Sequence, residues 1–585
     1  MGRPLSMASF ALNHYATGLD PFYFKLTNVF IHLLNGIGIY ALTTLLLNFY
    51  RKHFQPALGS DHAKWLGLTV AAAWLLHPFN LTSVLYVVQR MTSLSAFFSI
   101  WGLVLFVWGR TRLHESTDRD PKGTWALVTG LIIFTPLAVF SKENGALLPI
   151  LMLSVEITFF NFQCKRHATR QFLIGVYCIA VAIPLAATWV YLKNPIGTIL
   201  GGYIIRDFTL SERLMTEARV LWFYLHQIVL PSTTKMGLYH DDIAISRNLI
   251  QPLTTLFALI GILALLAVTL VARKKAPLIA FGLLFFFAGH VLESSVLALE
   301  IAHEHRNYLP MYGILLIVFY YLTFPLKYLA NLRLRQAAAV LLIGLFALNT
   351  YARAGKWANP VTLIESEVEN HPDSPRANGE MADIYSRLVS ENFNGAEMNA
   401  LQAQSYYHTA TELSTKNTHG LFGMIKLNAV RNRPINPSWI EELTHRLEQP
   451  PYAIDNGPKL IDLVNCQIAT VCKLPAQKLE GLLQASLRNP GLTHWSRANI
   501  YSALHLYRMN ISNDYDGAVE ALHLAIEAMP DALEYRLNLI KFLIIKKQFS
   551  QAGKELAQLK QIDIRQAHGP EIARLNDLLL LQTNP

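Results

Sequence analysis

The chain has 585 residues, of which 52% are apolar and only 15% charged, whereas a soluble globular protein carries about 25% charged residues. Its 50 Lys and Arg residues exceed its 40 Asp and Glu residues, and the excess lies in residues 1–360, because residues 361–585 hold 21 basic and 25 acidic residues. This composition indicates a membrane protein and excludes a disordered, collagenous or disulfide-stapled one. Nucleic-acid binding is a poor interpretation of the basic residues, because they lie between apolar stretches and not on one face.

Residues 1–25 are followed by apolar stretches of about 20 residues, each long enough to cross roughly 30 Å of hydrocarbon. We predict about ten membrane-spanning helices, at 26–49, 65–87, 91–109, 124–140, 145–160, 171–193, 253–272, 277–298, 309–329 and 336–353. An amphipathic stretch, 213–230, is expected to dip into the bilayer or to lie on it. Residues 26–353 are thus predicted to form a polytopic transmembrane helical bundle in an all-α protein.

Lys and Arg residues concentrate in five short loops between these stretches, and this bias is typical of cytoplasmic loops. They are Arg51, Lys52, Lys64, Arg110, Arg112, Arg119, Lys122, Lys165, Arg166, Arg170, Arg273, Lys274, Lys275, Lys327, Arg333 and Arg335. Alternation then places outside the segments 1–25, 78–90, 141–144, 194–252 and 299–308, together with residues 354–585. We expect a multi-pass inner-membrane protein whose C-terminal domain is periplasmic.

Residues 354–585 are predicted to form a separate helical domain, because Leu, Ala and Ile recur there at spacings of three and four. A small-to-large pattern at Ala518 and Leu522 returns at Ala552 and Leu556, 34 residues later. This is the tetratricopeptide period, in which small residues let paired helices pack closely. An irregular helical bundle is the alternative.

Cys466 and Cys472 are the only cysteines of this domain. An oxidising periplasm would favour a disulfide between them. On one continuous helix, however, residues six apart lie on different faces, so two unpaired buried thiols are the alternative.

Polar side chains at membrane depth are costly and need a partner or a purpose. Asn28, His32 and Asn35 follow one stripe of the first predicted span, where they either make interhelical hydrogen bonds or serve function. His290 and Glu293 lie one turn apart in the eighth predicted span, again as a structural or a functional pair.

Polar residues also gather in the predicted outer segments, where each alone would be an interfacial cap or a snorkelling side chain. They are His77, Pro78, Gln89, Arg90, Ser141 to Asn144, Tyr239 to Asp242 and Glu300 to Tyr308. Together they bring carboxylates, imidazoles and the cations Arg90, Lys142 and Arg306 to one side of the membrane. Such a set suits chemistry with a phosphate leaving group, since cations absorb its charge and a carboxylate takes the acceptor's proton.

His303, Glu304 and His305 could also hold a divalent ion. Neighbouring residues on a helix point about 100° apart, which argues against one shared ion. The sequence identifies no certain cofactor, and a divalent metal ion at these residues is the alternative that it leaves open.

Several motifs, in the same order along the chain, resemble those of polytopic GT-C glycosyltransferases. The matching residues are Arg3 to Ser6, Asn13, Gly18 to Pro21, Asn28, His32 to Asn35, His77, Pro78, Gln89, Arg90, Ser141 to Asn144, Pro149, Leu214 to Pro231 and Glu304 to Tyr308. The resemblance covers nearly the whole chain and is to the TMTC-type and bacterial relatives that end in tetratricopeptide repeats, kin of the protein O-mannosyltransferases. It implies inverting transfer of a sugar from a polyprenyl-phosphate carrier on the outer face of the membrane, with the repeats gathering a protein acceptor or partner.

Such enzymes usually begin with a cytoplasmic N-terminus and one more span, and the loop after that span carries the acidic catalytic base. This chain resembles them from a point after that loop. We therefore expect it to lack the first transmembrane helix and the first outer loop, which would make it a truncated and inactive enzyme unless another acid replaces the base. Asp20 is the only acidic residue before the first predicted span.

The resemblance assigns roles to individual residues. Contacts to the donor phosphate are expected from Arg90, Lys142, Arg306, Arg3 and Arg219. Catalytic carboxylates are expected at Glu143, Glu304 and Asp20. Substrate contacts are expected from His77, Gln89, His305, Asn307 and Tyr308.

Two other classes of function fit the same organisation. A non-catalytic scaffold for envelope or secretion assembly would use the membrane part as an anchor and the repeats as the working module. A flippase or polymerase for lipid-linked sugars would need a continuous polar path, for which the stripe on the first span is too short. The expected partners are a polyprenyl-phosphate-linked sugar, membrane lipid and a protein, and not nucleic acid.

Overall fold

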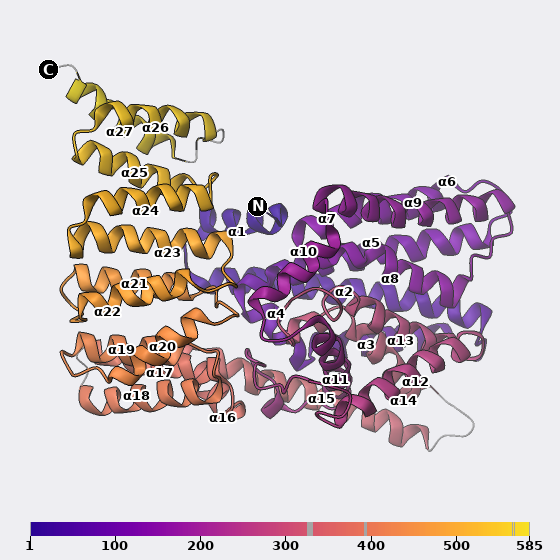
Figure 1. The fold of residues 1–585 in the computed structure, drawn as a ribbon. Coiled ribbons are helices and arrows are strands. Elements are labelled where there is room, and N and C mark those ends of the chain that lie inside the picture. The colour runs from indigo at the N-terminus through magenta and orange to yellow at the C-terminus, as the bar shows by residue number, and fades with distance from the viewer. Residues whose placement is uncertain (1, 325–330, 391–394, 564–565, 567, 584–585) are drawn as a thin grey trace. The chain divides into compact units, whose positions relative to one another are not determined.

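The computed structural model describes residues 2–324, 331–390, 395–563, 566 and 568–583, and within them all regular structure is helical (Figure 1). The chain divides into two compact units. Unit 1 comprises Met1–Gly202 and Phe208–Pro372, and unit 2 comprises Tyr203–Asp207 and Asp373–Pro585. The all-α prediction is confirmed, and unit 1 extends beyond residue 353, where the membrane part was expected to end.

Unit 1 is a bundle in which long helices alternate with short ones. Its α-helices are α1 (Pro4–Thr17), α2 (Pro21–His53), α3 (Ser60–Leu75), α4 (Leu81–Leu85), α5 (Arg90–Glu115), α6 (Pro121–Val128), α7 (Phe134–Ser141), α8 (Leu148–Val155), α9 (His167–Leu192), α10 (Pro195–Gly201), α11 (Leu210–Val229), α12 (Thr254–Lys275), α13 (Pro277–His290), α14 (Met311–Thr323), α15 (Leu332–Lys356) and α16 (Pro360–Asn370). Its short 3-10 or π segments are η1 (Pro78–Asn80), η2 (Val87–Gln89), η3 (Thr129–Ile133), η4 (Glu143–Leu147), η5 (Glu156–Phe160), η7 (Thr233–Lys235) and η8 (Glu304–Asn307). The 3-10 segment η6 (Gly202–Ile205) begins at the last residue of the first part of unit 1, and its other residues belong to unit 2.

Local sequence signals set where several of these helices begin. Proline occupies the first turn of α1, α2, α6, α13 and α16, where its missing N–H costs no hydrogen bond. The Asp20 carboxylate accepts from the Phe22 N–H at 2.9 Å and caps α2. Thr209 and Glu212 form a reciprocal capping box at the start of α11.

Six helical segments among the described residues are long and apolar enough to cross a membrane. They are Pro21–His53, Val87–Glu115, Pro121–Ser141, Glu143–Phe160, Thr254–Lys275 and Leu332–Lys356. A seventh is obtained if Ser60–Leu75 and Pro78–Leu85, which bend by 50° at a break, count as one span. Pro78 lies at that break. Proline has no N–H and cannot continue the hydrogen bonding of α3, so the helix ends before it.

The three remaining predicted spans take other forms. The stretches 277–298 and 309–329 contain the shorter apolar helices α13 and α14, and residues 325–330, including Lys327, lie outside the described residues. The stretch 171–193 is α9, in which several side chains lie outside the described ones. Among the described residues, seven of the ten predicted spans are therefore long and apolar enough to cross a membrane, if the bent pair counts as one span.

Glycines allow α5 to pack closely against α6 and η3. A Cβ added at Gly109 would lie 2.6 Å from the Gly123 carbonyl oxygen, and one added at Gly130 would lie 2.7 Å from the Gly102 carbonyl oxygen. Small residues at helix crossings are typical of membrane bundles, because they let backbones approach.

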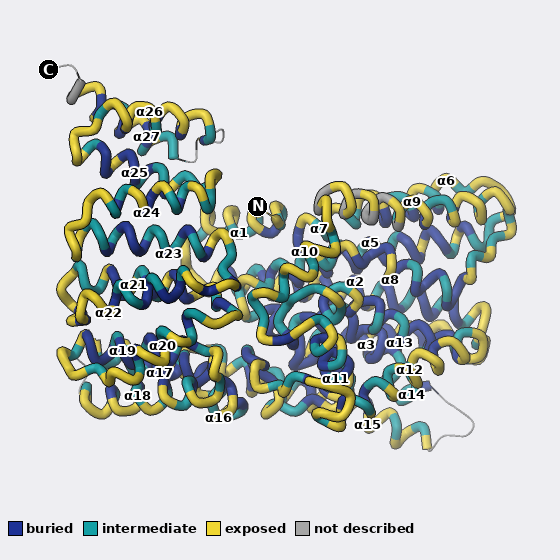
Figure 2. The backbone as a smooth tube through the Cα atoms, in the orientation of Figure 1, coloured by how far each residue is buried: buried dark blue, intermediate teal, exposed yellow. Residues whose placement is uncertain are grey.

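Two helices leave most of their apolar surface uncovered. In the most apolar 18-residue stretch of each helix, only 22% of the residues of α12 and 17% of those of α15 are buried. Both helices are largely exposed in Figure 2. Apolar exposure of this extent is expected for helices that contact lipid.

The polar stripe of α2 makes interhelical hydrogen bonds. Asn28 Nδ2 donates to the Val84 carbonyl at 2.9 Å. His32 Nδ1 lies 2.8 Å from the Tyr308 hydroxyl, which also accepts from Asn35 Nδ2 at 3.0 Å. The structural interpretation of the stripe is therefore confirmed.

Unit 2 is a stack of helical hairpins (Figure 1). Its helices are α17 (Pro375–Ser390), α18 (Ala396–Leu413), α19 (His419–Val430), α20 (Pro437–Glu448), α21 (Asn456–Ile468), α22 (Ala476–Leu487), α23 (His494–Tyr507), η9 (Arg508–Ser512), α24 (Tyr515–Ala528), α25 (Leu533–Ile545), α26 (Phe549–Ile562) and α27 (Gly569–Thr583). Ala518 and Leu522 are buried on α24, and Ala552 and Leu556 are buried on α26. Because α24 packs on α25 and α26 packs on α27, the 34-residue period corresponds to one hairpin.

Cys466 and Cys472 form a disulfide, with their Cα atoms 5.2 Å apart. Helix α21 ends at Ile468, and the chain then turns through Thr470 at a φ of 59°. The two cysteines do not share one continuous helix, so the geometric objection to pairing does not apply.

Candidate functional site

Part of the predicted polar rim converges on the segment that joins α7 to η4. Lys142 follows α7 in an extended conformation, and its side chain is buried. Lys142 Nζ donates to Thr92 Oγ1 at 3.0 Å and lies 3.3 Å from Glu293 Oε1. Both charged side chains are 9% exposed, so they form a buried ion pair.

Helix α1 is tied to the same segment. Arg3 Nε donates to both carboxylate oxygens of Glu143, at 2.8 and 2.9 Å, and Arg3 Nη2 lies 2.7 Å from Oε2. The Ser6 hydroxyl donates to the Ser141 carbonyl at 2.8 Å. The first helix thus adds a guanidinium group next to Lys142.

Arg306 reaches this region from η8. Its guanidinium donates to the carbonyls of Ile301 at 2.9 Å and Glu300 at 2.6 Å. Its Nη1 also lies 3.9 Å from Glu217 Oε1, which is 2.8 Å from Arg213 Nη2. Glu217 therefore partly balances two buried guanidinium groups.

His305 lies among these cations. Burial lowers the pKa of His305 well below 6.5, and the charges of Lys142, His303 and Arg306 lower it further. The ring is therefore neutral near pH 7 and can hydrogen-bond to an uncharged partner.

A small cavity of about 30 Å³, lined by both polar and apolar side chains, adjoins these residues. A cavity of this size holds about one water molecule or one polar group. Its lining includes Thr92, Ser95, Asn144, His305 and Arg306. We use the name Lys142 cluster for Arg3, Lys142, Glu143, Glu293 and Arg306.

Glu304 takes part in a different buried ion pair. Arg353 Nη2 donates to both of its carboxylate oxygens at 3.0 Å, and Arg353 Nη1 donates to the Pro78 carbonyl at 2.7 Å. Burial raises the pKa of Glu304 to about 7, although Arg353 acts to lower it. The pair joins η8, α15 and the break after α3.

Arg90, another predicted phosphate ligand, is fully buried and holds three elements together. Its Nε donates to Asn28 Oδ1 at 2.7 Å, its Nη2 to the Phe24 carbonyl at 2.9 Å and its Nη1 to the Ser9 carbonyl at 3.1 Å. The guanidinium also lies 4.6 Å from the centre of the Phe10 ring. Arg90 thus joins α1, α2 and α5.

Three further residues that were predicted to contact the donor or the substrate have hydrogen-bond partners within unit 1. His77 Nε2 lies 3.0 Å from the Ile228 carbonyl, and the Gln89 side chain accepts from the Thr92 hydroxyl at 2.8 Å. Arg219 donates to a carbonyl of the loop before α12 at 2.5 Å. Of these, Gln89 alone shares a partner with the Lys142 cluster.

Asn307 bonds within η8, whereas Tyr308, the next residue, contacts the bundle. Asn307 Nδ2 donates to the Glu304 carbonyl at 3.4 Å. The Tyr308 hydroxyl meets His32 and Asn35 inside the bundle, where it is buried.

The predicted metal ligands on η8 and beside it have other partners. His303 Nε2 lies 2.9 Å from Glu300 Oε2, and both oxygens of Glu304 accept from Arg353. The rings of His303 and His305 stack with centroids 4.9 Å apart. Across the described residues, the ligand atoms of these three side chains do not form a metal-binding group.

Sequence reasoning missed how these charges pair. Glu293 was expected to pair with His290, yet it pairs with Lys142, and His290 Nδ1 instead lies 2.9 Å from a backbone carbonyl of its own helix. Arg353 was not expected to have a role. The available signal was a single arginine at the end of an apolar helix, a residue that needs a partner at membrane depth.

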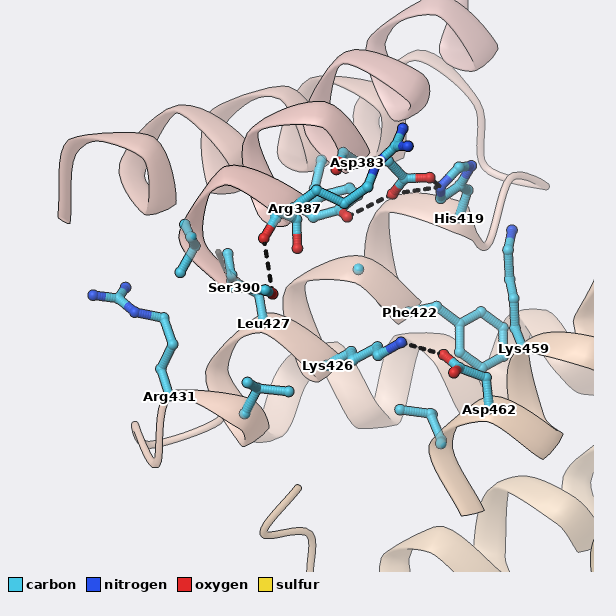
Figure 3. Close-up of a pocket in the computed structure, with 16 residues that line it drawn as sticks. Asp383, Arg387, Ser390, His419, Phe422, Lys426, Leu427, Arg431, Lys459 and Asp462 are labelled. Carbon is cyan, nitrogen blue, oxygen red and sulfur yellow. Dashed lines mark hydrogen bonds and ion pairs between the residues drawn. The ribbon is translucent and has the colours of Figure 1, made fainter. Parts of the chain in front are cut away.

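Unit 2 carries a separate pocket of about 350 Å³ (Figure 3). Asp383 accepts from the Tyr407 hydroxyl at 2.6 Å and lies 3.1 Å from His419 Nε2. Lys426 and Asp462 form an ion pair on another part of the lining. Charged groups of both signs thus line a concave surface of the helical stack.

Part of the chain is similar to curated proteins. Over 176 residues it is 27% identical to the protein O-mannosyl-transferase TMTC2 of Mus musculus and to that of Homo sapiens. The match covers 30% of this chain and 18% of each relative. No family model matches the chain, and no solved structure matches it. This partial similarity agrees with the resemblance of the motifs to TMTC-type proteins.

Proposed function

We propose that the chain is a membrane glycosyltransferase that transfers a sugar from a polyprenyl-phosphate-linked donor to a protein on the outer face of the membrane. The observation that carries this proposal is the Lys142 cluster, where side chains from the N-cap of α1, the α7–η4 segment, the loop after α13 and η8 meet next to a small cavity. The similarity to TMTC2, a protein O-mannosyl-transferase by name, supports the same class of reaction.

The proposed reaction is an inverting displacement. The acceptor hydroxyl attacks the anomeric carbon, the bond from that carbon to the lipid-phosphate oxygen breaks, and the hydroxyl proton passes to a carboxylate. Lys142, Arg306 and Arg3 stabilise the charge that develops on the departing phosphate. Glu143 takes the proton, since it is the most accessible carboxylate of the cluster, with 58% of its side chain exposed.

The other predicted carboxylates receive supporting roles. Glu304 positions η8 through its ion pair with Arg353. Asp20 remains the N-cap of α2.

Acceptor binding is assigned to unit 2. Its pocket beside Asp383 and Lys426 is concave and offers donors and acceptors of both charges. A helical stack presents such surfaces to extended peptides.

Transfer of radiolabelled mannose from polyprenyl-phosphate mannose to membrane protein, in proteoliposomes containing the full chain, tests the proposal. Lys142→Ala and Arg306→Ala are expected to reduce the rate about 10²–10³-fold, because each removes a charge that stabilises the transition state, worth about 2–4 kcal/mol. Lys64→Ala and Arg112→Ala, which remove exposed cations elsewhere, should leave the rate unchanged.

Loss of Lys142 leaves Glu293 without its partner, so folding needs its own control. The double variant Lys142→Met/Glu293→Gln removes both charges and should insert normally yet remain inactive. Normal transfer by Arg306→Ala or by the double variant would contradict the proposal.

A further inference from the structure

A second group of ligand-type side chains lies in unit 1, outside the Lys142 cluster. His240 and Asp242 belong to the loop between η7 and α12, and His371 directly follows α16. One ligand atom of each residue lies within 4.8 Å of the other two. His371 Nδ1 is 2.7 Å from Asp242 Oδ2, and the two imidazole rings are almost perpendicular with centroids 5.3 Å apart.

Both imidazoles are buried with nitrogen atoms that lack a partner. His240 is 7% exposed and His371 is 5% exposed, and Nε2 of each ring has no hydrogen-bond partner. Leaving a buried polar atom without a hydrogen-bond partner costs about 1–3 kcal/mol, so two unpartnered ring nitrogens this close together need an explanation.

We propose that His240, Asp242 and His371 bind a divalent transition-metal ion, with Zn²⁺ as the best fit. Two imidazoles and one carboxylate are a donor set that Zn²⁺ favours. Nitrogen atoms bound at about 2.0–2.1 Å to a tetrahedral ion lie roughly 3.3 Å apart, so small side-chain rotations would close the observed group around an ion. The ion takes the place of the proton now shared by His371 Nδ1 and Asp242 Oδ2, so His371 binds it through Nδ1, and the unpartnered nitrogen that the ion satisfies is Nε2 of His240.

The surroundings support a site with one open position. A cavity of about 450 Å³ is lined by all three residues and by Arg219 and Lys235. Three protein ligands and access from a cavity leave room for a fourth, oxygen ligand, which can be water or an anionic group held by the two cations.

A carboxylate also lies beside the ligating ring of His371. A Cβ added at Gly237 would lie 2.5 Å from Glu367 Oε2 and 2.8 Å from His371 Nε2, so both atoms border the space that this glycine leaves. Metal-bound histidines usually have a carboxylate or carbonyl near the second ring nitrogen. Glu367 also accepts from the N–H groups of Leu238 and Tyr239, at 2.8 and 3.2 Å, which orders the loop that carries His240.

Metal content of the full chain, purified in detergent without a polyhistidine tag, tests this site independently of sugar transfer. After removal of metal with a chelator and addition of Zn²⁺, elemental analysis is expected to find one bound ion per chain. Co²⁺ in its place should give the visible absorption of a tetrahedral complex. His240→Ala and His371→Ala should weaken Zn²⁺ binding at least tenfold, whereas His303→Ala, from the other histidine pair, should not.

Asp242→Asn provides a variant that keeps the shape of the side chain. It should weaken Zn²⁺ binding at least tenfold, and calorimetry of the metal-free protein should show that the variant, although it loses the ion pair with His371, still folds. Absence of a bound ion in the wild-type chain, unchanged affinity in all three variants, or loss of the ion in His303→Ala would overturn the proposal.

Discussion

Arg110 and Glu156 form an ion pair whose two side chains are fully buried. Arg110 Nε and Nη2 donate to the two carboxylate oxygens at 2.7 and 2.9 Å, and the Phe162 N–H donates to Glu156 at 2.7 Å. Removal of one partner leaves a buried charge uncompensated, so Arg110→Ala or Glu156→Ala should each lower the free energy of unfolding by about 3–5 kcal/mol. Denaturation in mixed detergent micelles measures this loss.

The double variant Arg110→Met/Glu156→Leu is the control for that loss. It removes both charges and should be more stable than either single variant, because apolar groups of similar size need no charge partner. Lys52→Ala, which breaks a pair whose side chains are 59% and 40% exposed, should change stability by about 0–1 kcal/mol. A double variant less stable than both single ones would contradict the account of this pair.

Asp383 makes the stability of unit 2 depend on pH. Burial acts to raise the pKa of Asp383, but hydrogen bonds from His419 and Tyr407 outweigh it and lower the pKa below its usual value. The ionised Asp383 carboxylate therefore stabilises unit 2 above about pH 3.9, which is the pKa of an aspartate in the unfolded chain. This stabilisation is lost as the pH falls through the lower pKa of Asp383 in the folded protein. Asp383→Asn should cost about 1 kcal/mol at pH 7, since 38% of the side chain is exposed and solvent screens the pair.

Calorimetry of the full chain at pH 7, 5 and 3 measures this dependence. The difference between wild type and Asp383→Asn should persist from pH 7 to pH 5 and shrink at pH 3. The exposed Asp516→Asn should show no such difference. A gap that widens toward pH 3 would contradict the assigned direction of the pKa shift.

At the scale of elements, the glycines of α5 determine how closely this helix packs on its neighbours. A side chain at Gly109 would meet backbone atoms of Gly123 and Leu127, at 2.6 and 2.9 Å, and backbone cannot move aside as a side chain tip can. Gly109→Val should therefore separate α5 from α6 and lower the unfolding temperature in detergent by several degrees, as expected for a loss of about 1–3 kcal/mol. Gly344→Val on α15, where a Cβ meets nothing within 4 Å, should leave it unchanged.

Much at this scale follows from the sequence, because apolar length and helical spacing are local properties. The helices at 26–49 and 253–272, which are long and apolar enough to span a membrane, and the buried helix face around Ala518 were predictable in this way. Pairings between distant segments were not. The disulfide of Cys466 depends on where α21 ends, and a six-residue spacing alone could not show that turn.

At the scale of the whole molecule, the sequence identified charged residues but not their arrangement. Five cations, Arg3, Arg90, Lys142, Arg219 and Arg306, were predicted as one set of phosphate contacts. The structure brings Arg3, Lys142 and Arg306 to one region, whereas Arg90 holds α1 to α2 and α5, and Arg219 donates to a loop carbonyl. Glu304 was predicted as a catalytic group, and its partner Arg353 lies on a helix with no motif to mark it. Contacts between residues far apart in the chain decide these roles, so sequence spacing could not.

The proposed reaction requires that the Lys142 cluster and unit 2 act on the outer side of the membrane. The test uses a chain whose free cysteines, Cys164 and Cys178, are replaced. A single new cysteine is then placed at Lys122, in a predicted cytoplasmic loop, or at Lys554, in unit 2, and reports the side of the membrane on which that position lies. Labelling with a membrane-impermeant maleimide in right-side-out vesicles is the measurement. The account predicts that Lys554→Cys is labelled in intact vesicles and Lys122→Cys only after permeabilisation; the reverse pattern would contradict it.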